Sequence, residues 1–210
     1  MNKISDYPYP LNLYRDLCDR LGKPFPEEIT DDQLKGLNTL MEGIPNERYR
    51  GILLQRYVMG KTYPEIGEQN GITGSRIGQM KQNILNKIAK SSLSGMLMGY
   101  DEFLATNTID VLDLSTRVER AFLRNDINTL EDIKYHGYSN IKNLRNVGVD
   151  TLTEIMEKTW FLWSEKEREQ EKKLSPRHKK NLETILAKNG LSSKKIKEII
   201  NFIEINVDAE

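Results

Sequence analysis

The feature that most constrains this chain is a series of helix-start and helix-stop signals within residues 44–90. Gly60 and Gly71 are suited to end helices, because glycine takes the left-handed conformation beyond a helix end without strain. Thr62 and Thr73 are suited to begin helices, and Thr62 opens a capping box. The spacing predicts three short helices, over about residues 46–59, 62–70 and 73–90.

The third of these helices has two different faces. Apolar residues recur on one face at helical spacing, at Ile77, Met80, Ile84 and Ile88. A short helix, a glycine turn and a polar-faced second helix form a helix-turn-helix, whose second helix enters the DNA major groove by its N-terminal end. The residues expected to contact the major groove are therefore Thr73, Ser75, Arg76, Gln79, Gln82, Asn83 and Lys87.

Positive charge is concentrated in the same stretch. The whole protein has 31 basic and 31 acidic residues and is neutral, whereas residues 44–92 hold eight Lys or Arg against three acids, a net charge of +5. DNA phosphates favour such a concentration through the release of counterions. Double-stranded DNA is thus the partner that this stretch predicts.

Several short motifs stand in order along these residues: Ile44-Pro45-Asn46-Glu47-Arg48, Glu65-Ile66-Gly67, Gly71-Ile72-Thr73 and Arg76-Ile77-Gly78-Gln79. Their order and spacing resemble region four of bacterial sigma factors. The resemblance implies binding to the −35 promoter element and to the β flap of RNA polymerase. Gly74-Ser75 stands where the family usually has Arg-Glu, and Gly78 where it has a second arginine. These departures favour the alternative that the protein modulates polymerase or a sigma factor through protein contacts, without direct DNA binding.

A second motif lies between Leu144 and Thr151. Its sequence, with Val147, Gly148 and Val149, has the pattern of a helix-hairpin-helix. The glycine permits another backbone to approach closely, and the free amides at the start of the next helix can hold a phosphate. We expect that helix to be long and to extend to about residue 173.

The surroundings of this motif resemble the C-terminal domain of the RNA polymerase α subunit, through Val111–Arg117, Thr129–Ile133, Leu144–Gly148 and Thr151–Ile155. The resemblance implies contact with the minor groove of A·T-rich DNA. Arg120 and Asp150 stand where the family has asparagine and lysine. The residues expected at the minor groove or its phosphates are Arg117, Arg120, Asn146, Gly148 and Thr151, with Glu154 in a supporting role.

The complete expectation is an all-α protein of five parts. These are an acidic N-terminal helical cover (1–43), the sigma-like helix-turn-helix (44–92), a linker (93–110), the α-like helix-hairpin-helix with an extended helix (111–173) and a C-terminal helical hairpin (174–210). A hairpin of 37 residues is too small to bury both its apolar faces alone, so a homodimer through this hairpin is one expectation. Packing on the rest of the protein or on another protein is the alternative.

The composition gives little support for an enzymatic, metal-binding or membrane function. One cysteine, Cys18, and two distant histidines provide no metal cluster or catalytic triad, so we expect no cofactor, no metal and no catalytic residue. No signal peptide and no run of 18 apolar residues is evident, which predicts a cytoplasmic protein at the nucleoid, of bacterial or phage type. The leading hypothesis is a DNA-binding transcription regulator that uses the major groove and an adjacent minor groove.

Overall fold

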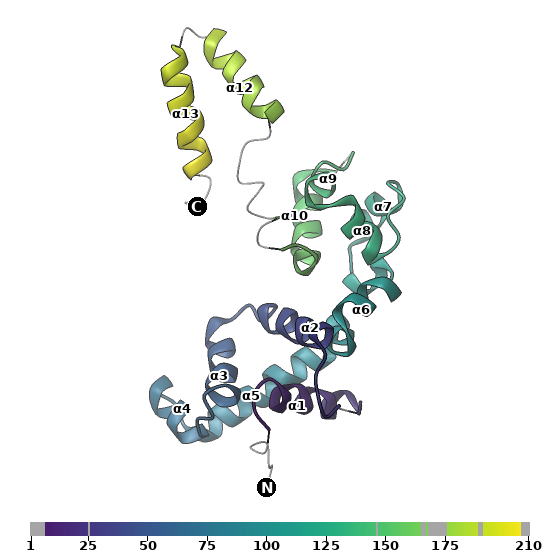
Figure 1. Ribbon diagram of the computed structural model, residues 1–210, viewed down its shortest axis with the longest axis vertical. Coiled ribbons are helices and arrows are strands. Elements are labelled where there is room, and N and C mark those ends of the chain that lie inside the picture. The colour runs from purple at the N-terminus through teal and green to yellow at the C-terminus, as the bar shows by residue number, and fades with distance from the viewer. Residues whose placement is uncertain are drawn as a thin grey trace. The chain divides into compact units, whose positions relative to one another are not determined.

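The computed structural model describes residues 7–24, 26–145, 147–164, 167, 176–188 and 191–206. Within these residues the fold is all-α, as predicted, with an isolated antiparallel bridge between Thr108 and Thr129. The chain divides into two compact units, Met1–Ile133 and Lys134–Glu210, whose helices are labelled in Figure 1. None of the described helices has the length and apolarity that crossing a membrane would require.

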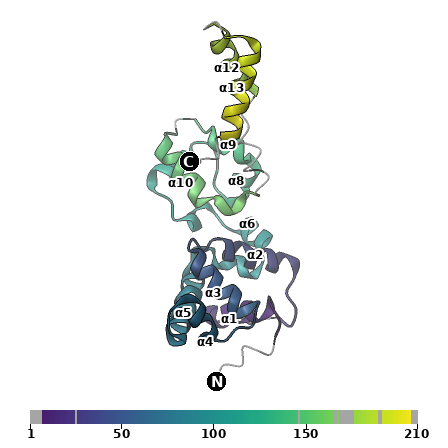
Figure 2. The ribbon, with the colours of Figure 1, turned by 90° about the vertical axis from the view of Figure 1, so that its left-hand side faces the viewer.

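The first unit is built from short helices separated by capped turns. They are α1 (Leu11–Leu21), α2 (Asp31–Glu42), α3 (Glu47–Tyr57), α4 (Tyr63–Asn70), α5 (Gly74–Lys90), η2 (Ser92–Met98), α6 (Tyr100–Thr106), η3 (Ile109–Leu112) and α7 (Thr116–Leu123). Figure 2 shows α1, α3, α4 and α5 gathered together, with α2 beside α6.

The predicted helix-turn-helix is present, and its caps are those read from the sequence. The Thr62 hydroxyl accepts from the Glu65 amide, and the Glu65 carboxylate accepts from the Thr62 amide at 2.7 Å. Gly71 ends α4 in the left-handed conformation at φ 65°, and Thr73 caps α5 by accepting from the Arg76 amide at 3.2 Å. The turn between α4 and α5 is therefore specified by local chemistry.

Two glycines bring α4 and α5 into close contact. A Cβ on Gly67 would lie 2.5 Å from the carbonyl oxygen of Ile72, and a Cβ on Gly74 would lie 2.9 Å from the nitrogen of Pro64. Below this contact, α3, α4 and α5 each contribute an isoleucine to one buried cluster, namely Ile52, Ile66 and Ile77. Backbone proximity and apolar burial together fix the angle of α5.

An ion pair joins the N-terminal cover to α5. Lys81 is 1% exposed, and its Nζ donates to Asp16 Oδ2 at 2.7 Å. The Tyr57 hydroxyl donates to the same carboxylate. Burial opposes ionisation of Asp16, but the hydrogen bonds from Lys81 and Tyr57 and the nearby cationic charges outweigh it, so the pKa of Asp16 lies below its ordinary value.

The segment over 93–110, which we expected to be a linker, is ordered structure that packs on α2. A Cβ on Gly36 would lie 1.9 Å from the carbonyl oxygen of Met96, so the backbones of α2 and η2 touch. Lys35 Nζ lies 2.8 Å from Asp101 Oδ1. The apolar side chains of this segment drive the packing, because they are buried: Met96, Leu97, Tyr100, Phe103, Leu104 and Ile109.

The second unit begins within α8 (Leu130–His136) and continues through α9 (Tyr138–Lys142), α10 (Val149–Lys158), η4 (Trp160–Leu162), α12 (Pro176–Lys188) and α13 (Ser193–Asn206). The last two form the predicted helical hairpin (Figure 1). Ile196 and Ile200 on α13 are buried, whereas Ile185 on α12 is 56% exposed.

The long helix predicted to run to about residue 173 is wrong, because α10 ends at Lys158. The carbonyl of Ile155 accepts from both the amide and the hydroxyl of Thr159, at 2.9 and 2.7 Å. Trp160 is half-buried, and the three apolar residues that follow it are buried, namely Phe161, Leu162 and Trp163. An α-helix turns by about 100° per residue, so it would expose part of such a consecutive run. The change to η4 lets these side chains be buried together.

Candidate nucleic-acid interface

The candidate DNA-contacting surface is the polar face of α5. Its buried side contains Ile77, Lys81, Ile84, Leu85 and Ile88. Its exposed side contains every residue that was predicted there, namely Ser75, Arg76, Gln79, Gln82, Asn83 and Lys87. Lys90 is also exposed on the polar side where the sequence placed it, and Asn86 is the exposed residue that the sequence interpretation had not included. Thr73 is exposed at the helix start, where its hydroxyl caps α5.

The first turn of α5 carries a linked pair of polar side chains. Arg76 Nη1 donates to Gln79 Oε1 at 3.3 Å, and both residues are exposed. The sequence of α5 contains four basic residues and no acidic one. Because the pair lies at the N-terminal end of an acid-free helix, it presents donors where a recognition helix meets base edges.

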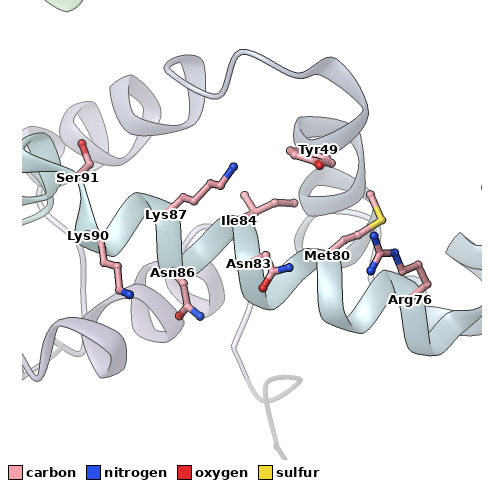
Figure 3. Close-up of a pocket in the computed structure, with 9 residues that line it drawn as sticks. All are labelled: Tyr49, Arg76, Met80, Asn83, Ile84, Asn86, Lys87, Lys90 and Ser91. Atoms are coloured by element: carbon pink, nitrogen blue, oxygen red, sulfur yellow. The ribbon is translucent and has the colours of Figure 1, made fainter.

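A groove separates α3 from α5 along one edge of this face (Figure 3). Tyr49 of α3 lies across from Met80 and Ile84 of α5, which supply apolar surface. The cationic residues that line the groove are Arg76, Lys87 and Lys90, and no acid is among its described lining residues. The arrangement suits a phosphate backbone running beside the helix.

The other edge of the face is bordered by α1. Arg20, in the last turn of α1, donates through Nη1 to Asn86 Oδ1 and through Nη2 to Gln82 Oε1. Sequence reasoning placed Gln82 at the major groove without this partner. It could not find Arg20, because no local signal marks a contact across 62 residues of sequence.

The electrostatics of the sigma-like segment differ from the formal charge in one respect. Lys81 contributes to the net charge of +5, yet it is buried against Asp16 and is not part of the exposed surface. The remaining basic residues of α5, Arg76, Lys87 and Lys90, are exposed. Within α5, the field available to a polyanion therefore comes from this exposed stripe, and outside α5 Arg48 is exposed as well.

In the α-like segment the expected contacts come from both units. Arg117 and Arg120 are exposed on α7 in the first unit, where Ser115 caps the helix. The second unit contains Gly148, Thr151 and Glu154, and Asn146 lies outside the described residues. Sequence reasoning predicted the local structure around each group but could not establish how the groups lie relative to each other.

Around the hairpin glycine, one expected contact is not at the surface. Thr151 is only 5% exposed, whereas Val149, which was not expected at the site, is 80% exposed. Gly148 is exposed and precedes α10 with φ −80°, a value open to any residue, and a Cβ there would meet nothing within 4 Å. Neither conformation nor internal packing thus requires a glycine at this position.

The described residues show no metal-binding cluster of His, Cys, Asp or Glu. Cys18 is buried in α1, and this burial raises the pKa of its thiol to about 11, so it is a packing residue rather than a nucleophile. The lowered pKa of the Asp16 carboxyl on α1 reflects the ion pair that holds α5 and not a reactive centre.

Two segments of the protein match families of the bacterial transcription machinery. Residues 46–90 match the family model for Sigma-70, region 4. Residues 101–159 match the model for the C-terminal domain of the bacterial RNA polymerase alpha chain, starting at residue 101 rather than 111 and so including α6. Both resemblances read from the sequence are confirmed. No curated protein and no solved structure gives a significant match.

These matches define the class of protein. Both families are of the DNA-binding, transcription-machinery type, and neither is enzymatic. The molecule is thus a transcription-related protein that combines two segments of DNA-binding type.

Proposed function

We propose that the protein is a DNA-binding transcription regulator whose helix α5 lies in the major groove and whose α-like segment contacts an adjacent minor groove. The observation that carries the proposal is the exposed face of α5, which is polar and cationic and contains no acid. Such a face fits the negative potential of the groove and the base edges within it.

The residues of α5 have different roles in this proposal. Arg76 and Gln79, in the first turns, contact base edges and supply sequence preference. Lys87 and Lys90, further along the helix, contact phosphates and fix the register of the helix on the duplex. Asn83 lies between the two groups and contacts whichever surface the docking angle brings near.

The minor-groove part of the proposal rests on α7 and on the hairpin glycine. Arg117 and Arg120 are exposed cations, and arginine inserts readily into narrow minor grooves. Neither the backbone conformation nor the packing within the protein requires glycine at position 148. This supports the idea that the glycine allows a DNA backbone to approach the amides at the start of α10. Thr151 then acts in packing rather than through its hydroxyl.

In vitro selection from a random duplex pool tests the proposal. We expect a short enriched motif for the wild-type protein. Arg76→Ala should relax preference at one or two positions of that motif by about 1–3 kcal/mol, while the other positions keep their preference. Enrichment of no sequence by the wild-type protein would contradict the proposed function.

A second candidate function is binding to RNA polymerase or a sigma factor through protein contacts alone. It is favoured by a cluster of exposed apolar residues at the end of α3, namely Leu54, Val58 and Met59, of which Met59 is 63% exposed. The sigma-like resemblance suggests the β flap as the partner. Pull-down from a bacterial lysate separates the functions: DNA retained only without nuclease favours the first, and polymerase retained after nuclease but lost in Val58→Glu favours the second.

Association of two copies through the C-terminal hairpin stays a prediction. The exposure of Ile185 on α12 is the observation that keeps it open. Light scattering of Ile185→Asp beside the wild type would test it, because a dimer held by this face should lose mass.

A further inference from the structure

Arg20 forms an unusual bridge between the N-terminal cover and α5. It lies outside the segment that matches sigma region 4, yet its guanidinium donates to two side chains on the exposed face of the expected recognition helix, Gln82 and Asn86. Its Nε lies 3.5 Å from Asp16 Oδ1, and the Arg20 side chain remains 17% exposed. The bridge therefore lies at the surface, at the edge of the α5 face.

The exposed groups of this cluster are mainly hydrogen-bond donors. Arginine has no acceptor, so Gln82 and Asn86 must each direct the amide oxygen toward Arg20. Gln82 and Asn86 are exposed, so their NH₂ groups remain available to another acceptor, as do the second N–H groups of Nη1 and Nη2, whereas Nε is buried beside Asp16. The nearby carboxylate of Asp16 already accepts from Lys81 and from Tyr57. Both of these bonds are to Oδ2, and Oδ1, beside Arg20 Nε, belongs to a side chain that is only 14% exposed. The exposed part of the cluster thus presents donors, which is the chemistry that binds an anion.

The cluster is also at the right distance along α5. Gln82 and Asn86 follow Arg76 by six and ten residues, which correspond to roughly 9 and 15 Å at 1.5 Å per residue. The major groove is about 12 Å wide, so side chains this far from the tip of an inserted helix reach the phosphates at the groove edge.

We propose that Arg20, Gln82 and Asn86 form a binding site for a backbone phosphate of duplex DNA. The inference rests on the proposed function and extends it, because it adds a residue from α1 to the interface and gives Gln82 a phosphate in place of a base edge. Bidentate reading of adenine needs both the oxygen and the NH₂ group of a glutamine, and the oxygen of Gln82 is already engaged.

Carboxylate variants separate a binding role from a structural one. Gln82→Glu and Asn86→Asp each place a carboxylate where Arg20 already donates, so the fold should be as stable as the wild type or more stable. The same change replaces an NH₂ donor by a negative charge that repels phosphate. Gln33→Glu is the matched control, because Gln33 lies in the capping box of α2 and glutamate completes that box equally well.

The experiment measures binding of a mixed-sequence duplex of about 25 base pairs by fluorescence anisotropy over a series of salt concentrations, together with the thermal midpoint of each variant. We expect Gln82→Glu and Asn86→Asp each to weaken binding about fivefold to tenfold at about 0.1 M salt and to lower the salt slope by about one unit, as the loss of one phosphate contact requires. Their thermal midpoints should match or exceed that of the wild type.

The outcomes are distinct. Binding by both variants equal to that of Gln33→Glu overturns the phosphate site and leaves the proposed function intact. A clear fall in the thermal midpoint of both variants also overturns the site, because it would mean that Arg20 does not face the two amide oxygens. Absence of duplex binding by the wild-type protein overturns the proposed function and this inference together.

Discussion

The sigma-like and α-like segments differ in how many structural elements supply their candidate contact residues. In the sigma-like segment all the candidate residues except Thr73 lie on the single helix α5, whose position is set by caps, two glycines and a buried ion pair. In the α-like segment the candidates come from α7 in the first unit and from the region of α10 in the second. The comparison teaches that a one-helix site follows from local sequence, whereas a site built from separate segments does not.

The largest expected effect tests whether the first unit depends on its N-terminal cover. Asp16→Ala leaves Lys81 buried without its carboxylate, so we expect the first unit to lose about 3–5 kcal/mol of unfolding free energy. Urea unfolding followed by far-UV circular dichroism should show an earlier transition. Both tryptophans, Trp160 and Trp163, lie in the second unit, so the tryptophan fluorescence transition should not move.

Asp19→Ala is the control for that measurement, because Asp19 is an exposed acid on the same helix. We expect its effect to stay within about 0.5 kcal/mol. A similar loss for both variants would mean that the ion pair with Lys81 does not hold α1 on α5.

Next, a pair of glycine substitutions compares the packing of the first unit with the hairpin glycine of the second unit. In Gly36→Ala the added Cβ would meet the carbonyl oxygen of Met96 at 1.9 Å, so we expect a loss of about 1–3 kcal/mol in the unfolding free energy. In Gly148→Ala the Cβ meets open space, and the loss should be about 1 kcal/mol or less. The effects on duplex affinity, measured on folded protein, should be in the reverse order, because Gly148→Ala should bind DNA more weakly than Gly36→Ala. Equal binding by both variants would remove Gly148 from the interface.

Much of the first unit was predictable because its signals are local. Thr62, Gly71 and Thr73 act within a few residues of themselves, and the structure places each in the predicted role. The bridge from Arg20 to Gln82 was not predictable, because it depends on how α1 packs on α5. The exposed face of α5 could thus be read from the sequence, but not the partner at its edge.

The segment over 93–110 shows how composition misleads. Its serines and glycines suggested a flexible linker, yet a side chain at Gly95 or Gly99 would displace a packed neighbour. A Cβ on Gly95 would lie 2.8 Å from the Phe103 ring, and a Cβ on Gly99 would lie 2.6 Å from Asp32 Oδ2. The apolar residues between the glycines were the better signal, because their burial makes the segment part of the first unit.

This packing changes the expected reach of Arg117. Within the first unit, the Lys35–Asp101 ion pair and the hydrogen bond from the Asp101 amide to Asp32, at 2.8 Å, hold α6 on α2. We therefore expect Arg117 to contact DNA only at one spacing from the site of α5. Arg117→Ala should weaken binding to a selected duplex by about 1–3 kcal/mol, and it should have no effect after about five base pairs are inserted between the two contacts.

The matching measurement is the affinity of the wild-type protein for the duplexes with and without the insertion. The insertion should weaken binding of the wild-type protein by as much as the Arg117→Ala substitution weakens binding to the duplex without the insertion. If the wild type tolerates the insertion and Arg117→Ala still matters there, the path from α2 to α7 behaves as a flexible tether.

The smallest expected effect is a loss of folding stability at low pH. The pKa of Asp16 is lowered in the folded protein, so its contribution to stability is complete above the unfolded value of about 3.9 and is lost as the pH falls through the lower folded value. Between about pH 5 and pH 3 the wild type should lose more stability than Asp16→Asn, as measured by urea unfolding at each pH. Parallel losses in the two proteins would show that Asp16 is not the group responsible.

The central claim is that the exposed face of α5 binds the DNA backbone and bases, and the salt dependence of duplex binding tests it most directly. The cations near this face and on α7 are Arg20, whose side chain is 17% exposed, and the exposed Arg76, Lys87, Lys90, Arg117 and Arg120. If about four to six phosphates are contacted, the slope of log affinity against log salt concentration should be about −4 to −5. A slope between zero and about −1 would contradict the account, because a protein that neutralises so few phosphates does not place this face on DNA.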